Sequence, residues 1–155
     1  MKLVSVIVMS YCSADTIVET LDSIKNQTYP RIELIITDDC SPDRTIQVVQ
    51  DWIAVNKGAL TAIKLVTSDK NTGLPANINR GLRVAEGEYY KGIAGDDYMT
   101  EDAIASYVTF CERHPGTFPI AKVRLFDDHD PNAVYGDVQS YCDRCYEFAK
   151  LDYRE

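Results

Sequence analysis

Blocks of apolar residues, each ended by a short polar stop, run along most of the chain. They are rich in β-branched residues, and the first is almost continuously apolar, which is typical of a strand buried on both faces of a parallel sheet. The blocks span residues 2–9, 32–37, 63–66, 89–94 and 120–126. We therefore predict a strand in each.

Between the strands, apolar side chains recur at helical spacing. Side chains that could cap the helix starts are Ser13 or Asp15, then Ser41 with Pro42 behind it, and Thr100. The apolar stripes are Ile17, Val18, Leu21 and Ile24; Ile46, Val49 and Ile53; Leu74, Ile78, Leu82 and Ala85; and Ile104, Val108 and Cys111. Each stripe predicts one helix that packs on the sheet.

Strands that alternate with helices predict an α/β fold, with a Rossmann-like, doubly wound and mainly parallel sheet flanked by helices. Neither a repeat nor a linker divides the sequence, so we expect one domain over residues 1–155. Ligands of such sheets bind outside the carboxyl ends of the strands. The candidate functional residues are therefore those that follow the strands.

Two acidic pairs stand at predicted strand ends. Asp38 and Asp39 end the second strand, where turn and capping roles are an equal alternative. Asp96 and Asp97 end the fourth strand, and their mutual repulsion favours a bound cation over a solvated turn. One or two carboxylates together with substrate phosphates are a common site for Mg²⁺ or Mn²⁺. The chain lacks Gly-rich phosphate-binding motifs, so a metal is the expected neutraliser of a diphosphate.

Charge and cysteine content narrow the partners and the compartment. Sixteen Lys and Arg against 24 Asp and Glu give a net charge of −8, so we expect no nucleic-acid partner. The first apolar block stops at Ser10 and Tyr11 without a cleavage site, which indicates a strand and not a signal peptide or membrane span. Five cysteines are an odd number with no secretory signal, which favours free thiols in the cytoplasm.

Several motifs in a fixed order resemble family 2 glycosyltransferases, which have the GT-A fold. They cover about residues 3–115, and no single one of them is specific. In chain order they are 4–11, Leu21-Asp22-Ser23-Ile24, Asn26-Gln27-Thr28-Tyr29, Asp38-Asp39-Cys40-Ser41, Asn71-Thr72-Gly73, Asn79-Arg80-Gly81-Leu82, 85–89 and Gly95-Asp96-Asp97. The resemblance implies inverting transfer of a sugar from a nucleotide diphosphate donor to a hydroxyl acceptor, with Mn²⁺ or Mg²⁺ bridging the diphosphate.

The resemblance also implies residue roles. Met9 and Tyr11 would border the base, and Asp38 would accept a hydrogen bond from a uracil N–H, which favours a UDP-sugar donor. Asp96 matches the last Asp of the family's Asp-x-Asp metal motif and Asp97 follows it, so both are expected to bind nucleotide and metal.

This chain departs from the family pattern at Ala94, where an Asp is usual, and at Ile78, where many relatives have an Arg. Two residues, Lys70 and Arg80, are then candidates for the cation that binds the diphosphate. Arg80 could also be an exposed helix residue.

The resemblance further implies an acceptor that is a saccharide or a lipid-linked saccharide, in cell-surface polysaccharide or glycolipid synthesis at the inner face of the membrane. Family members continue past this length, so we expect the acceptor-binding region and the catalytic base beyond residue 155. Asp127, Asp128 and His129 come too early for that base and predict a solvated acidic loop. Cys142 and Cys145 are a lone C-x-x-C and give no zinc site.

Two other functions are compatible with parts of this sequence. One is a nucleotide- and metal-binding module without transferase activity. The other is a phosphoacceptor receiver, which also collects Asp at strand ends but needs its acidic pair after the first strand, where this chain has Ser10 and Tyr11. The sequence therefore favours the transferase, with the binding module as the alternative.

Overall fold

The computed structural model describes residues 1–117 and 119. Its strands are β1 (Val4–Ser10), β2 (Ile32–Asp38), β3 (Ala62–Thr67) and β4 (Tyr89–Ala94), and its helices are α1 (Ile17–Lys25), α2 (Thr45–Val55), α3 (Leu74–Val84) and α4 (Ala103–Arg113). The chain divides into a compact unit, Met1–Glu112, and a second unit, Arg113–Glu155, most of which lies outside the described residues. The single domain over 1–155 stays a prediction, as does the strand at 120–126, which also lies outside the described residues.

The four strands form one parallel sheet in the order β3-β2-β1-β4. On one side of β1, Val4 pairs with Ile32 and Ser10 with Asp38. On its other side, Val4 pairs with Tyr89 and Met9 with Ala94. Because chain order reverses at β1, the sheet is doubly wound, and the α/β fold predicted from the sequence is confirmed.

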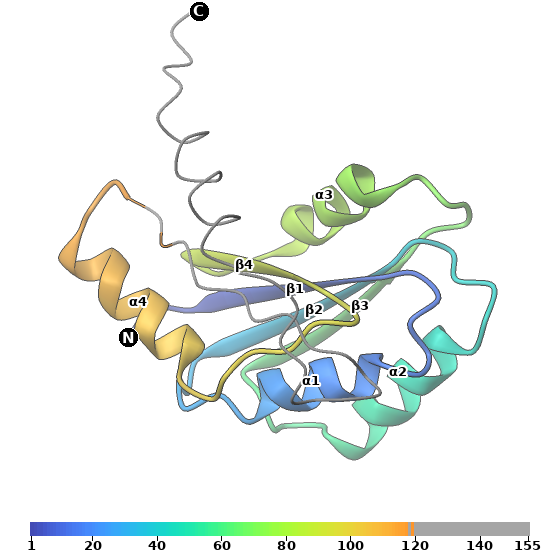
Figure 1. Cartoon of the computed structure of the whole chain (residues 1–155), viewed down its shortest axis with the longest axis horizontal. Coiled ribbons are helices and arrows are strands. Elements are labelled where there is room, and N and C mark those ends of the chain that lie inside the picture. The colour runs from blue at the N-terminus through green and yellow to red at the C-terminus, as the bar shows by residue number, and fades with distance from the viewer. Residues whose placement is uncertain (118, 120–155) are drawn as a thin grey trace, which may run out of the picture. The chain divides into compact units, whose positions relative to one another are not determined.

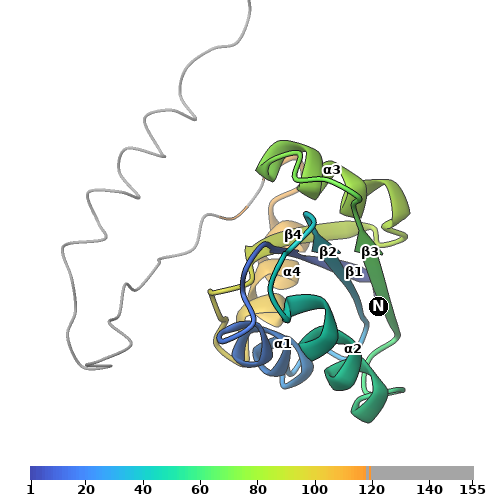
Figure 2. The same cartoon turned by 90° about the vertical axis from the view of Figure 1, so that its right-hand side faces the viewer.

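Helices cover both faces of this sheet. Figures 1 and 2 show α1 and α2 on one face and α3 on the opposite face. Alternate residues of β1 point into the core on the first face, as expected for a strand. That core contains Val4, Val6, Val8, Ile17, Leu21, Ile24, Leu34, Ile36, Val49, Trp52, Ile104 and Val108. The predicted stripes of the first and fourth helices are thus largely the buried ones.

The α3 face is packed differently from the predicted stripe. Leu74 leaves 63% of its surface exposed, whereas Asn77 and Gly81 are the buried residues of the helix. A Cβ on Gly81 would lie 2.5 Å from Cγ2 of Ile7, so only glycine allows α3 to approach the sheet this closely. Asn77 and Gly81 therefore lie at the centre of the contact face, whereas Ile78, Leu82 and Ala85 of the predicted stripe are only partly buried.

Two predicted helix starts are wrong. The N-cap residue of helix α1 is Thr16 and not Ser13 or Asp15. The N-cap residue of α2 is Arg44 and not Ser41. The Ser41 hydroxyl donates to Asp38 at 2.5 Å and accepts the Cys12 N–H at 2.9 Å, so it holds two loops together instead of capping a helix.

A buried charged group lies near the amino ends of the strands. Glu33, whose side chain is 1% exposed, accepts the Ser5 hydroxyl at 2.5 Å and pairs with Lys64 at 2.6 Å. Burial raises the pKa of the Glu33 carboxyl, but hydrogen bonds from the Glu86 N–H, Lys64 and Ser5 outweigh it and lower that pKa overall. The Gly87 N–H donates to the Ser5 hydroxyl at 2.9 Å. The segment that leads into β4 therefore lies beside Ser5 and Glu33.

We expect Gly87→Ala to lower the free energy of unfolding by about 3 kcal/mol, because overpacking forces the backbone to shift. The added Cβ would lie 2.6 Å from both the backbone N and the Oγ of Ser5. Urea denaturation measures the loss. Gly58→Ala is the matched control, since nothing lies within 4 Å of its Cβ position and only its positive φ is strained. Equal losses in the two variants would contradict the steric argument.

Candidate functional site

The carboxyl end of β1 is bracketed by the chain segments that leave β2 and β4. The Asp39 N–H donates to the Ser10 carbonyl at 3.1 Å, and the Gly95 N–H donates to the Met9 carbonyl at 2.9 Å. Both acidic pairs therefore emerge at the same edge of the sheet, one on each side of β1. Tyr11, 48% exposed, follows β1 at this edge.

Asp38 is buried, and its carboxylate links the carboxyl end of β1 to the β2–α2 loop through hydrogen bonds. Its Oδ1 accepts the Ser41 N–H at 2.8 Å, and its Oδ2 accepts the hydroxyls of Ser41 and Ser10 at 2.5 and 3.1 Å. A carboxylate offers about four acceptor positions, two on each oxygen. Among the described residues Asp38 therefore meets three donors, and Oδ1 keeps one acceptor position.

Asp39 is also buried, but its acceptor positions are filled. Its Oδ2 accepts the N–H groups of Thr72 and Gly73 at 2.8 and 2.6 Å, while Oδ1 accepts the Thr72 hydroxyl and a short hydrogen bond from Arg80. Burial raises the pKa of this carboxyl, but the hydrogen bonds from Thr72, Arg80 and Gly73 outweigh it and hold the pKa at about 2. Asp39 is therefore ionised at neutral pH and ties the β3–α3 loop to the end of β2.

Arg80 is not an exposed helix residue, because its side chain is 16% exposed and pairs with Asp39. The guanidinium also donates to the Thr72 hydroxyl at 2.8 Å and to the Asn77 amide oxygen at 3.1 Å. Of the two cations considered from the sequence, Lys70 is the exposed one, two residues before Thr72 in the same loop.

The loops after β1 and β2 are joined by hydrogen bonds. Besides the contact from Cys12 to Ser41, the Ser13 N–H donates to the Thr45 hydroxyl at 2.9 Å. Cys12 and Cys40 both have positive φ values, 53° and 64°, which are uncommon outside glycine and mark tight loop geometry. These contacts fix the position of the loop that carries Tyr11.

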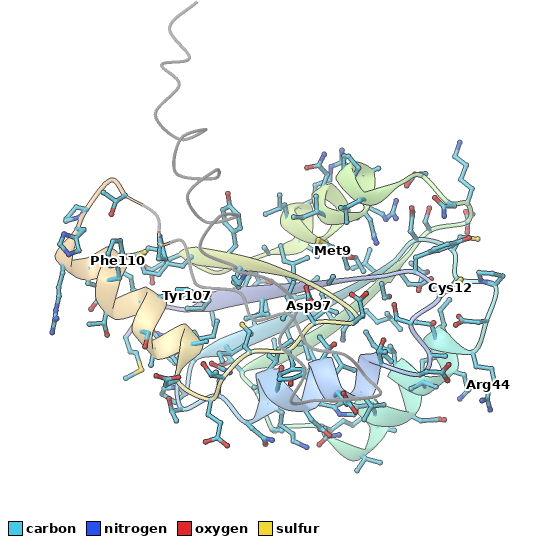
Figure 3. All side chains as sticks on the ribbon, viewed as in Figure 1. Met9, Cys12, Arg44, Asp97, Tyr107 and Phe110 are labelled. Atoms are coloured by element: carbon cyan, nitrogen blue, oxygen red, sulfur yellow. The ribbon has the colours of Figure 1, made fainter. Side chains whose placement is uncertain are left out.

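Asp96 and Asp97 are both exposed just past the end of β4, where Figure 3 labels Asp97. Partial desolvation and the charge of Asp96 raise the pKa of the Asp97 carboxyl, against the opposing effect of Lys91. A divalent cation would relieve this repulsion. Among the described residues, no three His, Cys, Asp or Glu side chains gather around a metal position.

Met9 is a partly buried residue of β1, and its side chain lies on the side of the sheet that α3 covers (Figure 3). Its Cε lies 3.8 Å from the Cβ position of Gly92, and Cδ1 of Ile78 lies 3.3 Å from the same point. Ala94 is the register partner of Met9. The two departures from the family pattern, Ala94 and Ile78, thus belong to one apolar seam beside the site.

Sequence reasoning missed the joint role of Asp39, Thr72, Asn77 and Arg80. Asp39, Thr72 and Arg80 belong to motifs that are visible in the sequence, Asn77 belongs to none of them, and the pairing of these residues at a strand end cannot be seen in the sequence. The predicted site residues Met9, Tyr11, Asp38, Lys70, Asp96 and Asp97 follow or end strands β1, β2, β3 and β4.

With this geometry, comparison with known proteins identifies the class. The model of the glycosyl transferase family 2 matches residues 5–151, and the chain belongs to this family. The poly(ribitol-phosphate) β-N-acetylglucosaminyltransferase TarS of Staphylococcus aureus is 33% identical over 122 residues, which are 77% of this chain and 21% of TarS. The Escherichia coli protein WfaP, a UDP-Glc:α-D-GlcNAc-diphosphoundecaprenol β-1,3-glucosyltransferase, is 30% identical over 98% of this chain and 61% of its own length.

Solved structures agree with the expected GT-A fold. The mannosyltransferase PcManGT of Pyrobaculum calidifontis, in complex with GDP-Man and Mn²⁺, has a TM-score of 0.67 and 29% identity over 83% of this chain and 37% of that one. The chain thus spans from about a fifth to about three fifths of the curated relatives named above. No helix in the described part of the chain is long and apolar enough to cross a membrane.

Proposed function

We propose that this protein is an inverting glycosyltransferase that transfers a sugar from a nucleotide diphosphate, with UDP favoured, to a hydroxyl of a saccharide or lipid-linked acceptor. The observation that carries the proposal is the convergence of Asp38, Asp39, Asp96 and Asp97 around the end of β1, beside the exposed Tyr11. The names of TarS and WfaP give poly(ribitol-phosphate) and a diphosphoundecaprenol-linked sugar as acceptors, which supports a role in cell-surface polysaccharide or glycolipid synthesis. We propose that this synthesis takes place at the inner face of the membrane.

In this proposal the base lies against Met9 and Tyr11, and a uracil N–H donates to Asp38. The acceptor position left on Oδ1 of Asp38 supports that role, because Asp39 has all four of its positions filled by described donors. Lys70 is exposed in the β3–α3 loop, the loop that Asp39 ties to the end of β2. In this proposal Lys70 is the cation that binds the diphosphate.

Asp96 and Asp97 would hold Mn²⁺ or Mg²⁺ together with diphosphate oxygens. The donor set fits such an ion, since two exposed carboxylates and no closed cage of protein ligands leave room for substrate oxygens. When bound, the ion would act as a Lewis acid on the leaving diphosphate. Because both carboxylates are exposed, they can bind the ion without a change in the backbone at this end of the sheet.

The test is calorimetry of the nucleotides with Mn²⁺. Asp38→Asn is expected to weaken uridine diphosphate binding by about 1–3 kcal/mol, because an amide is a poorer acceptor than a carboxylate and one of its ends donates. Guanosine diphosphate is expected to bind more weakly than uridine diphosphate to the wild type. Thermal unfolding of the variant is the control, since Asp38 also holds Ser10 and Ser41. Unchanged affinity would remove Asp38 from the site, and a preference for guanosine diphosphate, the nucleotide of the PcManGT donor, would overturn the UDP assignment.

A nucleotide- and metal-binding module without transferase activity is the second candidate, favoured by the apolar Ala94 beside Met9 where the family has a carboxylate. Slow donor hydrolysis by a version extended to the length of its relatives separates the two, because a transferase passes sugar to water and a binding module does not.

A further inference from the structure

The turn that carries the second acidic pair is fixed to β1 and to the start of α1. It begins at Ala94, whose carbonyl accepts the Asp97 N–H at 3.2 Å. Inside the turn, the Gly95 N–H donates to the Met9 carbonyl at 2.9 Å, and the Gly95 carbonyl accepts the Thr16 hydroxyl at 2.9 Å. Both backbone polar groups of Gly95 are therefore bonded, one to β1 and the other to the N-cap residue of α1.

Close packing holds the same point of the chain. Gly95 is buried, and a Cβ at this position would lie 2.9 Å from Cδ1 of Ile17 and 3.1 Å from Oγ of Ser13. Gly95 does not have a positive φ value, so the close approach and not the backbone conformation favours glycine here. The end of β4 thus lies directly against the segment that leads from β1 into α1.

The Thr16 side chain is not used to cap its own helix. An N-cap hydroxyl usually accepts an N–H group of the first helical turn, but Thr16 makes no such bond. The hydroxyl has one hydrogen to donate. Its nearer acceptor is the Gly95 carbonyl at 2.9 Å, since the Ser13 carbonyl lies at 3.5 Å. The hydroxyl therefore serves the end of β4.

The segment at residues 13–16 is in turn held by the β2–α2 loop. The Ser13 N–H donates to the Thr45 hydroxyl at 2.9 Å, and that hydroxyl donates to the Asp43 carboxylate at 2.6 Å. Through Thr16, the turn after β4 is therefore connected to the loops after β1 and β2. These are the loops around which the donor site is proposed.

We propose that Thr16 is a positioning residue for the divalent ion of the donor site. It fixes the Gly95 carbonyl, and with it the turn that presents Asp96 and Asp97, so that both carboxylates are in place before the ion binds. A turn that is already ordered spares the cost of ordering it on binding. This inference rests on the proposed function for its ion, whereas the order of the turn is a property of the free protein and can be measured without a ligand.

The experiment compares three single variants with the wild type. Thr16→Val removes the hydroxyl and keeps the shape of the side chain, whereas Thr16→Ser keeps the hydroxyl. Thr109→Val is the matched control, because it removes a hydroxyl that donates to a backbone carbonyl at 2.8 Å within α4. Uridine diphosphate is titrated by calorimetry with Mn²⁺ and with a chelator. Amide hydrogen exchange is followed by NMR in the ligand-free proteins at Gly95, Asp97 and Asp39.

Thr16→Val is expected to fold and to keep the nucleotide affinity measured with the chelator. The gain in affinity that Mn²⁺ provides should fall about tenfold, as is common when a residue that holds metal ligands in place is lost. Exchange should accelerate at Gly95 and Asp97, whose N–H groups bond in and beside the turn. It should stay unchanged at Asp39, whose N–H bonds to β1 on the other side. Thr16→Ser and Thr109→Val should resemble the wild type.

Wild-type behaviour of Thr16→Val, or a loss that Thr16→Ser shares, would overturn the proposal. Loss of the Mn²⁺ gain without faster exchange in the turn would do the same. Faster exchange at all three amides, with equal weakening of binding with and without Mn²⁺, would show a merely structural role and also overturn it.

A wild type that gains nothing from Mn²⁺ would refute the proposed metal site, and exchange would still decide whether Thr16 positions the turn. Faster exchange in Thr16→Val that is confined to Gly95 and Asp97 supports this positioning. Unchanged exchange refutes it.

Discussion

Residues 1–155 are expected to bind uridine diphosphate with Mn²⁺ yet to transfer sugar about 10²–10⁴ times more slowly than a version extended to the length of its relatives, because a general base commonly contributes that factor. The groups proposed to bind the donor lie around the carboxyl end of β1, within the first unit of the chain, Met1–Glu112. That the base and the acceptor site lie in a later segment is a prediction from the family resemblance. Calorimetry and a radiolabelled-sugar transfer assay, run on both proteins, measure the two properties separately.

The control for this comparison is equal donor affinity in the two proteins, which shows that the shorter one has a complete donor site. Robust transfer by residues 1–155 would contradict the prediction and direct attention to Asp127, Asp128 and His129, which lie outside the described residues. Loss of both binding and transfer would instead show that the later segment completes the donor site.

Asp96→Ala is expected to abolish the gain in uridine diphosphate affinity that Mn²⁺ provides, a loss of about 10- to 100-fold if the contact is worth as much as other charge-assisted ones. The side chain is exposed at the sheet edge, so the fold should be retained. Removing one carboxylate lowers the repulsion that raises the pKa of Asp97, so the gain provided by Mn²⁺ is compared within each variant and not between variants. Calorimetry with Mn²⁺ and with a chelator measures the difference.

Glu19→Ala is the matched control, because Glu19 is an exposed acidic residue of α1 with the same charge. It should leave the Mn²⁺ effect intact. Nucleotide binding that is insensitive to the chelator in the wild type would refute the metal assignment, whatever the variants show.

Periodic patterns predicted most of the described fold. All four described strands and the helices between them were predicted near their observed positions, because a buried strand needs a continuous apolar run and a packed helix needs an apolar stripe. Positions 38 and 96 could be placed at strand ends for the same reason. Local sequence carries this information, since each element is set by residues close to one another in the chain.

The helix starts and the α3 contact face were mistaken because their hydrogen-bonding partners are remote. Ser41 is an excellent capping residue by its chemistry, yet Asp38 and Cys12 take its hydroxyl. Gly81 and Asn77 are the most buried residues of α3, ahead of the partly buried Ile78, because α3 comes close to Ile7 and the strand ends, where a glycine and a hydrogen-bonding amide fit.

The sequence by itself determined the family, the parallel sheet and the edge at which the acidic residues meet. Only the tertiary structure decided what the individual side chains do there. Asp38 and Asp39 are adjacent and chemically identical, but Thr72, Gly73 and Arg80, which lie 33 to 41 residues away from Asp39, fill that carboxylate. Asp38 keeps an acceptor position among the described residues. A hydrogen bond depends on distance and direction in space, and the spacing of residues along a chain contains neither.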